Sequence, residues 1–204
     1  MPRKLPRASK PSAAWNLGLP WTTARLVLRT SRSKDTAQLV RILNDRRISE
    51  RTTIPYPYTS ADARRFLPHA SRRLRAGHGF DLLCFLKKDQ QLVGGIALGL
   101  RRPERPYRCA EVGYWISPAY WGQGLATEAL QPMLDAGFRI LRLHRIEAWC
   151  HSDNEASIRL LKHAGFREEG RGRESVFRGG RWWDRILFGL LASEYRARSR
   201  KPAS

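Results

Sequence analysis

Short stretches of the chain alternate between hydrophobic and polar residues or form brief apolar runs, patterns that are typical of β-strands. In the first of them, Leu26 and Leu28 fall on one face while Arg25 and Arg29 fall on the other. The predicted strands are residues 24–30, 81–86, 92–98, 110–116, 145–150, 175–177 and 184–191. Short polar or glycine-containing turns separate the second strand from the third and the last two from each other, so both pairs are expected to form β-hairpins.

Apolar residues recur at helical spacing between these strands. The predicted helices run from Ser33 to about Asn44, from Ser60 through Leu67, from Gly124 to about Leu141, and from Asn154 to Gly165. Ser33, Ser60 and Asn154 are expected N-caps, because their side chains accept hydrogen bonds from free backbone N–H groups. Pro68 is expected to kink or break its helix and Pro132 to bend the next, since proline lacks the N–H donor. This mixture of hairpins and helices predicts a single α/β (α+β) domain.

The composition is that of a globular protein. Of the 204 residues, 42% are hydrophobic and 27% are charged, which excludes a wholly disordered basic chain. No apolar run approaches the ~20 residues that a membrane-spanning helix needs. No apolar segment follows the basic residues at the N-terminus, so neither a secretory signal nor a membrane partner is predicted.

Positive charge concentrates at the two ends of the chain. Of 38 Lys and Arg and 18 Asp and Glu, which give a net charge of +20, eight basic and no acidic residues lie in residues 1–20 and 196–204. Both ends also hold Pro, Ser and Ala, so we expect basic, disordered tails around a folded domain of residues 21–195. The excess charge fits either simple solubility or contact with an anionic partner such as RNA or the ribosome.

The cysteines indicate neither a disulfide framework nor a metal site. Cys84, Cys109 and Cys150 are odd in number and form no Cys-x-x-Cys pair. Each stands among apolar or aromatic residues, where cysteine acts as a small hydrophobic residue. His144 and His151 are not joined by an acidic residue at a metal-ligand spacing. A reducing cytoplasm is the expected compartment.

The segment most informative about chemistry joins the strand at residues 110–116 to a helix. Gly122 and Gly124 stand at the mouth of that helix, where glycine lets a ligand approach the backbone closely. Free N–H groups of a first helical turn, together with the helix dipole, attract an anion such as pyrophosphate. The turn has no Walker lysine and no complete Gly-x-Gly-x-x-Gly, which disfavours nucleoside triphosphates and NAD. Taken alone, the two glycines favour a tight turn without a ligand, because short glycine motifs are common.

Several ordered motifs resemble those of the GNAT-type N-acetyltransferases. They are Glu111–Pro118, Trp121–Ala129, His144–Ala148, Asn154–Ser157 and Gly165–Phe166. Arg25–Arg29 and Gly180–Arg185 are similar to the Rim-type ribosomal-protein branch. The resemblance covers about residues 21–195. It implies one domain with a central, mixed, mostly antiparallel twisted sheet flanked by helices, acetyl-CoA as co-substrate, no metal, and direct transfer of acetyl to a primary amine in a ternary complex.

The resemblance assigns the acetyl-CoA contacts by position. The implied residues are Gly122, Gln123, Gly124, Leu125, Ala126 and Thr127 for the pyrophosphate, and Trp115, Ile116 and Asn154 for the pantetheine arm. The pyrophosphate would meet backbone N–H groups, and the arm would pair with a strand edge as a peptide does. Trp121 stands where the family usually has Gln or Arg, a small change in a turn that binds through its backbone.

Two residues are the catalytic candidates. Glu111 is the expected general base, because alternation places it on the same strand face as Gly113 and Trp115, beside the acyl donor. Glu147, or a water chain to a carboxylate, is the alternative base. The family's usual tyrosine is replaced by Leu161, so Ser157 is the expected partner of the CoA thiolate. Simpler roles stay open, an ion-paired strand residue for either Glu and local backbone binding for Ser157.

The expected acceptor is the N-terminal α-amine of a protein, with a ribosomal protein implied by the resemblance. A small-molecule amine is the alternative among enzymes, although a cationic protein should repel polyamines. A catalytically silent CoA-fold protein with RNA-binding tails is the alternative outside enzymes. Trp182 and Trp183 are expected to be buried, or else to frame the acceptor entrance. Both a monomer and a homodimer are compatible with the sequence.

Overall fold

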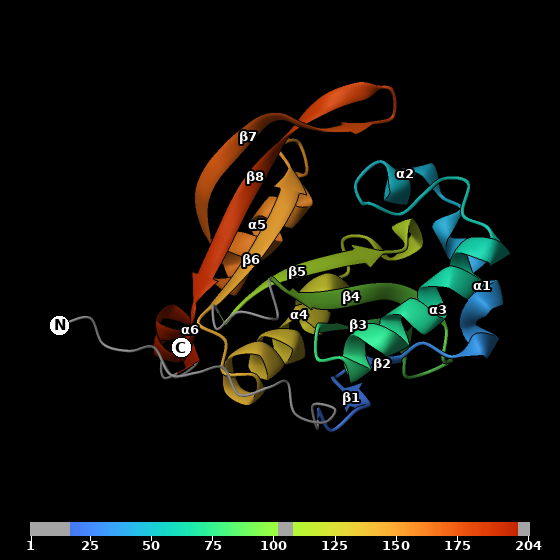
Figure 1. Cartoon of the computed structure of the whole chain (residues 1–204), viewed down its shortest axis with the longest axis horizontal. Coiled ribbons are helices and arrows are strands. Elements are labelled where there is room, and N and C mark those ends of the chain that lie inside the picture. The colour runs from blue at the N-terminus through green and yellow to red at the C-terminus, as the bar shows by residue number, and fades with distance from the viewer. Residues whose placement is uncertain (1–16, 102–107, 200–204) are drawn as a thin grey trace.

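A computed structural model describes residues 17–101 and 108–199. One eight-stranded sheet, in the order β1-β2-β3-β4-β5-β6-β8-β7, carries helices on both faces (Figure 1). The strands are β1 (Trp21–Thr22), β2 (Leu26–Thr30), β3 (Gly79–Leu86), β4 (Leu92–Leu100), β5 (Cys109–Ile116), β6 (Arg145–His151), β7 (Arg167–Arg178) and β8 (Arg181–Leu191). All neighbours are antiparallel except β5 and β6, which are parallel. The predicted mixed, mostly antiparallel sheet is therefore confirmed.

Helices connect the strands on both sides of the sheet. They are α1 (Thr36–Leu43), α2 (Arg46–Ser49), α3 (Ser60–Arg75), α4 (Leu125–Asp135), α5 (Glu155–Ala164) and α6 (Ala192–Ser199). Two 3₁₀ turns, Ser33–Asp35 and Pro118–Tyr120, and a π-helical turn, Ala136–Ile140, complete the elements. No helix in the described ranges is long and apolar enough to cross a membrane.

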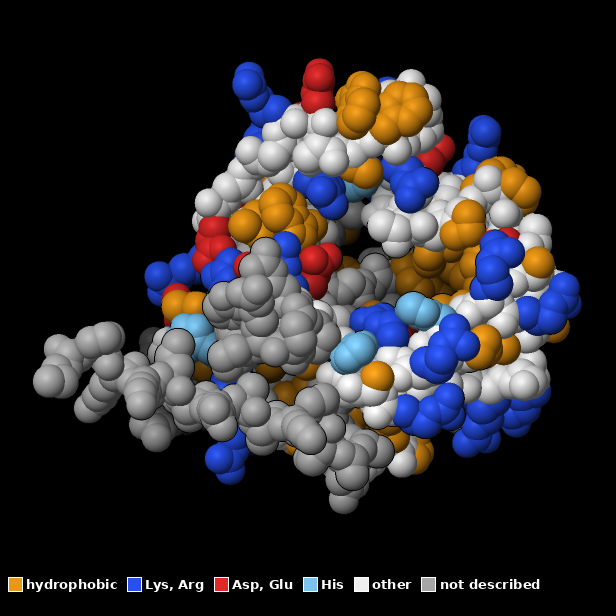
Figure 2. Space-filling model, in the orientation of Figure 1, with side chains coloured by type: hydrophobic (Ala, Val, Ile, Leu, Met, Phe, Trp, Pro, Cys, Tyr) orange, Lys and Arg blue, Asp and Glu red, His pale blue; other side chains and the backbone are white. Residues whose placement is uncertain are grey.

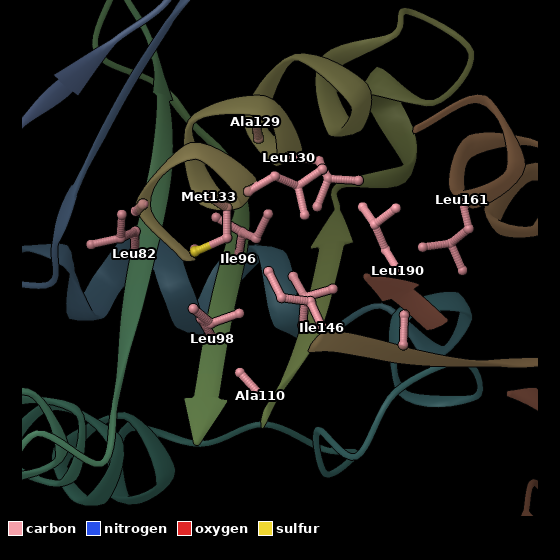
Figure 3. Packing of buried hydrophobic residues seen from close by; sticks show 14 of the residues in the cluster. Leu82, Ile96, Leu98, Ala110, Ala129, Leu130, Met133, Ile146, Leu161 and Leu190 are labelled. Carbon is pink, nitrogen blue, oxygen red and sulfur yellow. The ribbon is translucent and has the colours of Figure 1, made fainter. Parts of the chain in front are cut away.

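The larger core lies between the sheet and α4. Leu130 and Met133 are almost fully buried and belong to the same cluster as Leu82, Ile96 and Leu98 of the central strands (Figure 3). Burying one such side chain contributes about 1.5–3 kcal/mol. This packing fixes α4 on the sheet, and with it the position of the helix N-terminus that follows the glycine turn.

A second core covers the opposite face of the same strands. Leu39 of α1 and Ala63 of α3 pack there against Leu83 and Phe85 of β3. Because helices cover both faces, β3 is buried along nearly all of its length and reads as a continuous apolar run rather than an alternating one. The two layers of helices thus enclose the central strands and leave their ends for a site.

A buried ion pair attaches the start of α1 to the sheet. Arg29 of β2 donates two hydrogen bonds of 2.8 Å to the Asp35 carboxylate, whose side chain is 2% exposed. The backbone N–H of Arg32 adds a third, at 2.7 Å. Burial alone would raise the pKa of Asp35, but these hydrogen bonds outweigh it and hold the pKa below its ordinary value. The Arg29 guanidinium also lies 3.9 Å from the centre of the Phe85 ring.

The helix starts and the effect of Pro68 differ from prediction. Thr59, not Ser60, caps α3, because its side chain and that of Asp62 each accept the other's backbone N–H. The predicted cap at Ser33 is replaced by a 3₁₀ turn that ends at the buried Asp35. A break at Pro68 is wrong, since α3 continues to Arg75 and its packed face compensates the missing hydrogen bond.

The later helices follow the prediction more closely. Asn154 caps α5, and Gly165 ends it with a positive φ of 97°. Soon after Pro132 the α-helical hydrogen bonding of α4 ends, and a π-helical turn carries the chain on to Ile140.

The predicted domain limits and the burial of the late tryptophan also need correction. Leu17 is buried and its carbonyl accepts a hydrogen bond from Trp21, so the packed chain begins before residue 21. At the other end α6 continues past residue 195 to Ser199. Trp182 is 58% exposed rather than buried, because it lies near the tip of the long β7–β8 hairpin. The remainder of both predicted tails lies outside the described residues.

We expect Asp35→Asn to lower the free energy of unfolding by about 3 kcal/mol at neutral pH, because it leaves Arg29 buried without a counter-charge. The pKa of Asp35 is lowered in the folded state, so its contribution is present above about pH 4 and is lost as the pH falls further. In urea unfolding, the difference in free energy of unfolding between Asp35→Asn and wild type should therefore be smaller at pH 3 than at pH 7. Asp45→Asn, which changes an exposed helix cap, is the control and should cost less than about 1 kcal/mol. Equal losses of unfolding free energy in the two variants would contradict the role of Asp35 as the buried counter-charge of Arg29.

Candidate active site

The two central parallel strands separate partway along their length. β5 and β6 pair only through three residue pairs, from Cys109 with Arg145 to Glu111 with Glu147. Beyond Glu111, β5 stays paired with β4 up to Ile116, and β6 stays paired with β8 up to His151. In the described ranges, residues 112–116 thus have a strand on one side only. The backbone of such an edge can pair with an extended ligand.

A cleft of about 1,440 Å³ opens where the strands separate. Residues of β5, of the turn at 121–127, of the end of β6 and of the first turns of α5 line it, together with the segment 47–54 around α2. Figure 2 shows this hollow between the β7–β8 hairpin and the α1–α3 layer, with Lys and Arg side chains around its rim. The volume exceeds that of a typical small-molecule pocket and suits two ligands.

The glycine turn forms one end of the cleft. Gly122 and Gly124 both have a φ of 73°, and Gly124 is the N-cap of α4, which no side chain caps. The N–H groups of Leu125, Ala126 and Thr127 belong to the first helical turn and have no helical acceptor. A Cβ at Gly122 would meet no atom within 4 Å, so the space in front of it is open. The turn is therefore built to receive an anion on backbone N–H groups.

Contacts from the β1–β2 connection hold this turn in place. Glu128, in the first turn of α4, accepts hydrogen bonds from Thr23 Oγ1 at 2.5 Å and from the backbone N–H and Nε of Arg25 at 2.6 and 2.7 Å. Arg25 also donates to the carbonyl of Gln123 at 2.9 Å. The pKa of Glu128 is lowered because these bonds outweigh the effect of burial. Sequence reasoning missed Glu128, although an acid in the first turn of a helix is a recognisable signal.

Two hydroxyl groups meet on the α5 side of the separated strands. Ser157 Oγ lies 2.7 Å from Tyr114 Oη, and the Ser157 N–H donates to Asn154 Oδ1 at 3.2 Å. Burial raises the pKa of Tyr114 well above its ordinary value, so its phenol stays protonated. Burial also raises the pKa of the neighbouring Cys150 thiol to about 11, against a hydrogen bond from Ser157. Tyr114 was not predicted; its signal was its place in β5 one residue after Gly113.

Glu111 reaches the cleft from the opposite face of the sheet. Its neighbours on that face are Gly99, its partner on β4, and Gly113, and it lines the cleft. Glu147, directly across the parallel pair, is instead held in ion pairs with Arg145 at 2.9 Å and with Arg101. Glu111 thus lies in the cleft, whereas the carboxylate of Glu147 is held in two ion pairs.

Trp115 and Ile116, at the end of β5, also make contacts within the protein. The Trp115 indole packs over Gly95, where a Cβ would lie 2.6 Å from its Nε1, and so forms part of the cleft wall. The carbonyl of Ile116 accepts a hydrogen bond of 2.7 Å from Trp121 Nε1. Trp121 thus ties the glycine turn to the end of β5. In the described ranges no group of His, Cys, Asp and Glu is placed to hold a metal ion.

Residues 25–167 match the family of the acetyltransferase (GNAT) domain. The chain belongs to the GNAT family. Over 175 residues it is 30% identical to the uncharacterized N-acetyltransferase YnaD of Bacillus subtilis (strain 168), covering 85% of this chain and 98% of YnaD. The solved structure of Mycobacterium smegmatis RimJ in complex with CoA-disulfide matches 90% of this chain and 97% of RimJ, with 27% identity and a TM-score of 0.74. Vibrio cholerae spermidine N-acetyltransferase in complex with CoA and spermine matches 84% and 98%, with 25% identity and a TM-score of 0.71.

This GNAT protein is an N-acetyltransferase with acetyl-CoA as its co-substrate. The expected fold and the resemblance to Rim-type enzymes are confirmed. The residues of the cleft fit the co-substrate: an open, uncapped helix N-terminus suits its pyrophosphate, and the free edge of residues 112–116 suits the amides of its pantetheine arm.

We expect Gly122→Ala to weaken coenzyme A binding about tenfold, because an L-residue disfavours a φ of 73° and its Cβ would occupy the open space before the turn. Gly180→Ala is the matched control: its φ of 81° and empty surroundings are similar, but it lies in the β7–β8 turn. Titration calorimetry measures both affinities, with circular dichroism as the check on folding. Similar affinities in the two variants would show that the turn does not hold the co-substrate.

We expect Ser157→Ala and Tyr114→Phe each to lower kcat at least tenfold while KM for acetyl-CoA changes less than threefold. Because the two hydroxyls share one hydrogen bond, the double variant should lose little more than either single variant. Steady-state kinetics of the four proteins provides the test. Tyr195→Phe removes a largely buried hydroxyl that bonds Gln131 far from the cleft and should leave kcat unchanged. If the double variant instead loses the sum of the two single-variant losses in activation free energy, the two hydroxyls act independently, which would contradict their shared role.

Proposed function

We propose that the enzyme acetylates the N-terminal α-amine of a protein, with ribosomal proteins as the acceptor class. The observation that carries the proposal is the opposed placement of Glu111 and the Tyr114–Ser157 pair on the two faces of the parted strands. The likeness to RimJ and the Rim-like motifs support the acceptor class. The three cysteines, free of disulfides, fit a reducing cytoplasm.

Glu111 accepts the proton that the amine loses as it attacks. An α-amine has an ordinary pKa of about 7.7–8.0, so a substantial fraction is already neutral near pH 7.5. A carboxylate in the cleft then needs only to take the second proton directly or through one water molecule. Glu111 lies on the face lined by α2 and α3, which leaves the other face for the co-substrate's leaving group.

Ser157 and Tyr114 hold a proton on the opposite side. Acetyl-CoA supplies an activated thioester carbonyl when bound. The contact of 2.7 Å between Tyr114 Oη and Ser157 Oγ allows the protonated phenol to donate to Ser157, whose hydroxyl can then donate its own proton to the departing CoA thiolate. The family's usual tyrosine position is Leu161, which is fully buried in the core. We propose that Tyr114, from β5 rather than α5, supplies the phenol that this position lacks, and that N–H groups of residues 112–116 face the oxyanion.

A small polyamine is the second candidate acceptor, favoured by the likeness to the Vibrio cholerae spermidine N-acetyltransferase structure. Among the described residues, five acidic ones line the cleft, namely Glu50, Asp81, Glu111, Asp153 and Glu155. Five arginines of the described ranges line it as well, and one of them, Arg73, neutralises Asp81 through hydrogen bonds of 2.9 and 3.0 Å. The formal charge of the described lining is therefore balanced, and the Rim-like motifs carry the choice of an α-amine over a polyamine.

We expect Glu111→Gln to lower kcat/KM for an N-terminal peptide by about 10²–10³-fold, because the base is lost. Coenzyme A affinity should stay within threefold of wild type. Labelled acetyl-CoA is presented to a panel of ribosomal-protein N-terminal peptides and to spermidine, with Glu168→Gln, an exposed acid on β7, as the control. A kcat/KM within threefold of wild type would remove Glu111 as base, and turnover of spermidine alone would overturn the acceptor assignment.

A further inference from the structure

His151 is a buried side chain that the proposed chemistry does not use. It ends β6, is 5% exposed and lines the cleft. Its Nδ1 is fully buried and has no hydrogen-bond partner among the described residues. The ring packs against Trp183, with centroids 5.4 Å apart. A buried polar atom without a partner is costly, so its presence beside a cleft points to a ligand group.

Arginines from three different elements surround His151. Arg51 follows α2, Arg185 is the direct partner of His151 on β8, and Arg178 lies at the end of β7. Burial and these three charges lower the pKa of His151, against the opposing effect of Asp153, so the imidazole is neutral near pH 7. A neutral imidazole still offers one N–H donor.

Two of the three arginines carry charge that no acid balances. Arg51 forms an ion pair with Asp153. Within the described ranges, neither Arg178 nor Arg185 has an acidic side chain within 4 Å, and Nε of Arg178 is buried without a partner. Arg185 instead lies 5.0 Å from the Trp149 ring centre and bonds Ser175 at 3.2 Å. Excess positive charge and a free imidazole donor therefore meet at one end of the cleft.

We propose that His151, Arg185 and Arg51 bind a carboxylate of the acceptor. Guanidinium and imidazole N–H groups are the donors that a carboxylate takes, and charge-assisted bonds of this kind are about twice as strong as neutral ones. The inference rests on the proposed function, because it places the acceptor's amine beside Glu111. Arg178 stands behind the subsite and adds to its positive field without lining the cleft.

The distance between the proposed base and the carboxylate subsite favours a peptide with an acidic side chain over a free amino acid as the acceptor. His151 lies four residues beyond Glu147, which pairs with Glu111. At about 3.3 Å per residue, His151 lies about 13 Å along the sheet from Glu147 and from its partner across the strands, the proposed base Glu111. An extended peptide covers that distance with an Asp or Glu side chain at its third or fourth residue. A free amino acid, whose amine and carboxylate share one carbon, cannot reach both groups.

The test compares two N-terminal peptides that differ only by Glu or Gln at the fourth residue. Wild type should acetylate the Glu peptide with about tenfold higher kcat/KM. Arg185→Gln should abolish this preference, so that the ratio of kcat/KM between the Glu peptide and the Gln peptide falls to about one. Arg167→Gln, on the same hairpin but paired with Glu194 at its far end, is the matched control and should keep the preference. In NMR, the pKa of His151 should rise when the Glu peptide binds, because a carboxylate stabilises the imidazolium.

The outcomes separate this inference from the proposed function. Equal acetylation of both peptides by wild type overturns the carboxylate subsite and leaves the peptide acetyltransferase in place. Acetylation of free glutamate as fast as the Glu peptide overturns the assignment to peptides and makes the carboxylate that of a small molecule. Failure of every peptide to be acetylated, while spermidine is, overturns the proposed function itself.

Discussion

The rest of the site depends on the parting of β5 from β6 after Glu111. β4 holds β5 up to Ile116, and β8 holds β6 up to His151, so neither strand can turn to follow the other. An edge of unpaired peptide groups inside a protein is costly unless something pairs with it. The fold therefore maintains an unsatisfied edge that an extended amide-containing ligand completes. The Tyr114–Ser157 hydrogen bond spans the same opening from its α5 side.

The parts that sequence alone predicted well are those whose pattern follows burial. The β3–β4 hairpin and the start and end of α5 agree with prediction, because apolar runs, Asn154 and Gly165 each act locally. β7 is far longer than residues 175–177, since nearly all of it is exposed and charged and is held by pairing with β8. Tyr114 was missed for a related reason: a tyrosine in a strand reads as core until its neighbour across the fold, Ser157, is known.

The two faces of the sheet divide the chemistry by charge. The face of α4 and α5 carries neutral hydroxyls, a thiol with a raised pKa and backbone N–H groups, which suit a thiolate and a pyrophosphate. The face of α2 and α3 carries Glu111 together with paired and unpaired arginines. The net charge of +20 does not extend into the described lining of the cleft, where five arginines face five acids, and Arg196 belongs to α6 rather than to a tail.

The protonation state of the acceptor also bears on which amine such a cleft can use. Only the neutral amine is nucleophilic, and nearby positive charge lowers an amine's pKa because it disfavours the ammonium form. The ordinary pKa of an α-amine is already close to neutral pH, so a small lowering of that pKa makes the amine mostly neutral. A lysine or polyamine amine, with a pKa near 10.4, needs a large lowering. The α-amine therefore needs the least change to reach its reactive, neutral form. In the proposed mechanism, Glu111 then receives only the one proton that this neutral amine loses as it attacks.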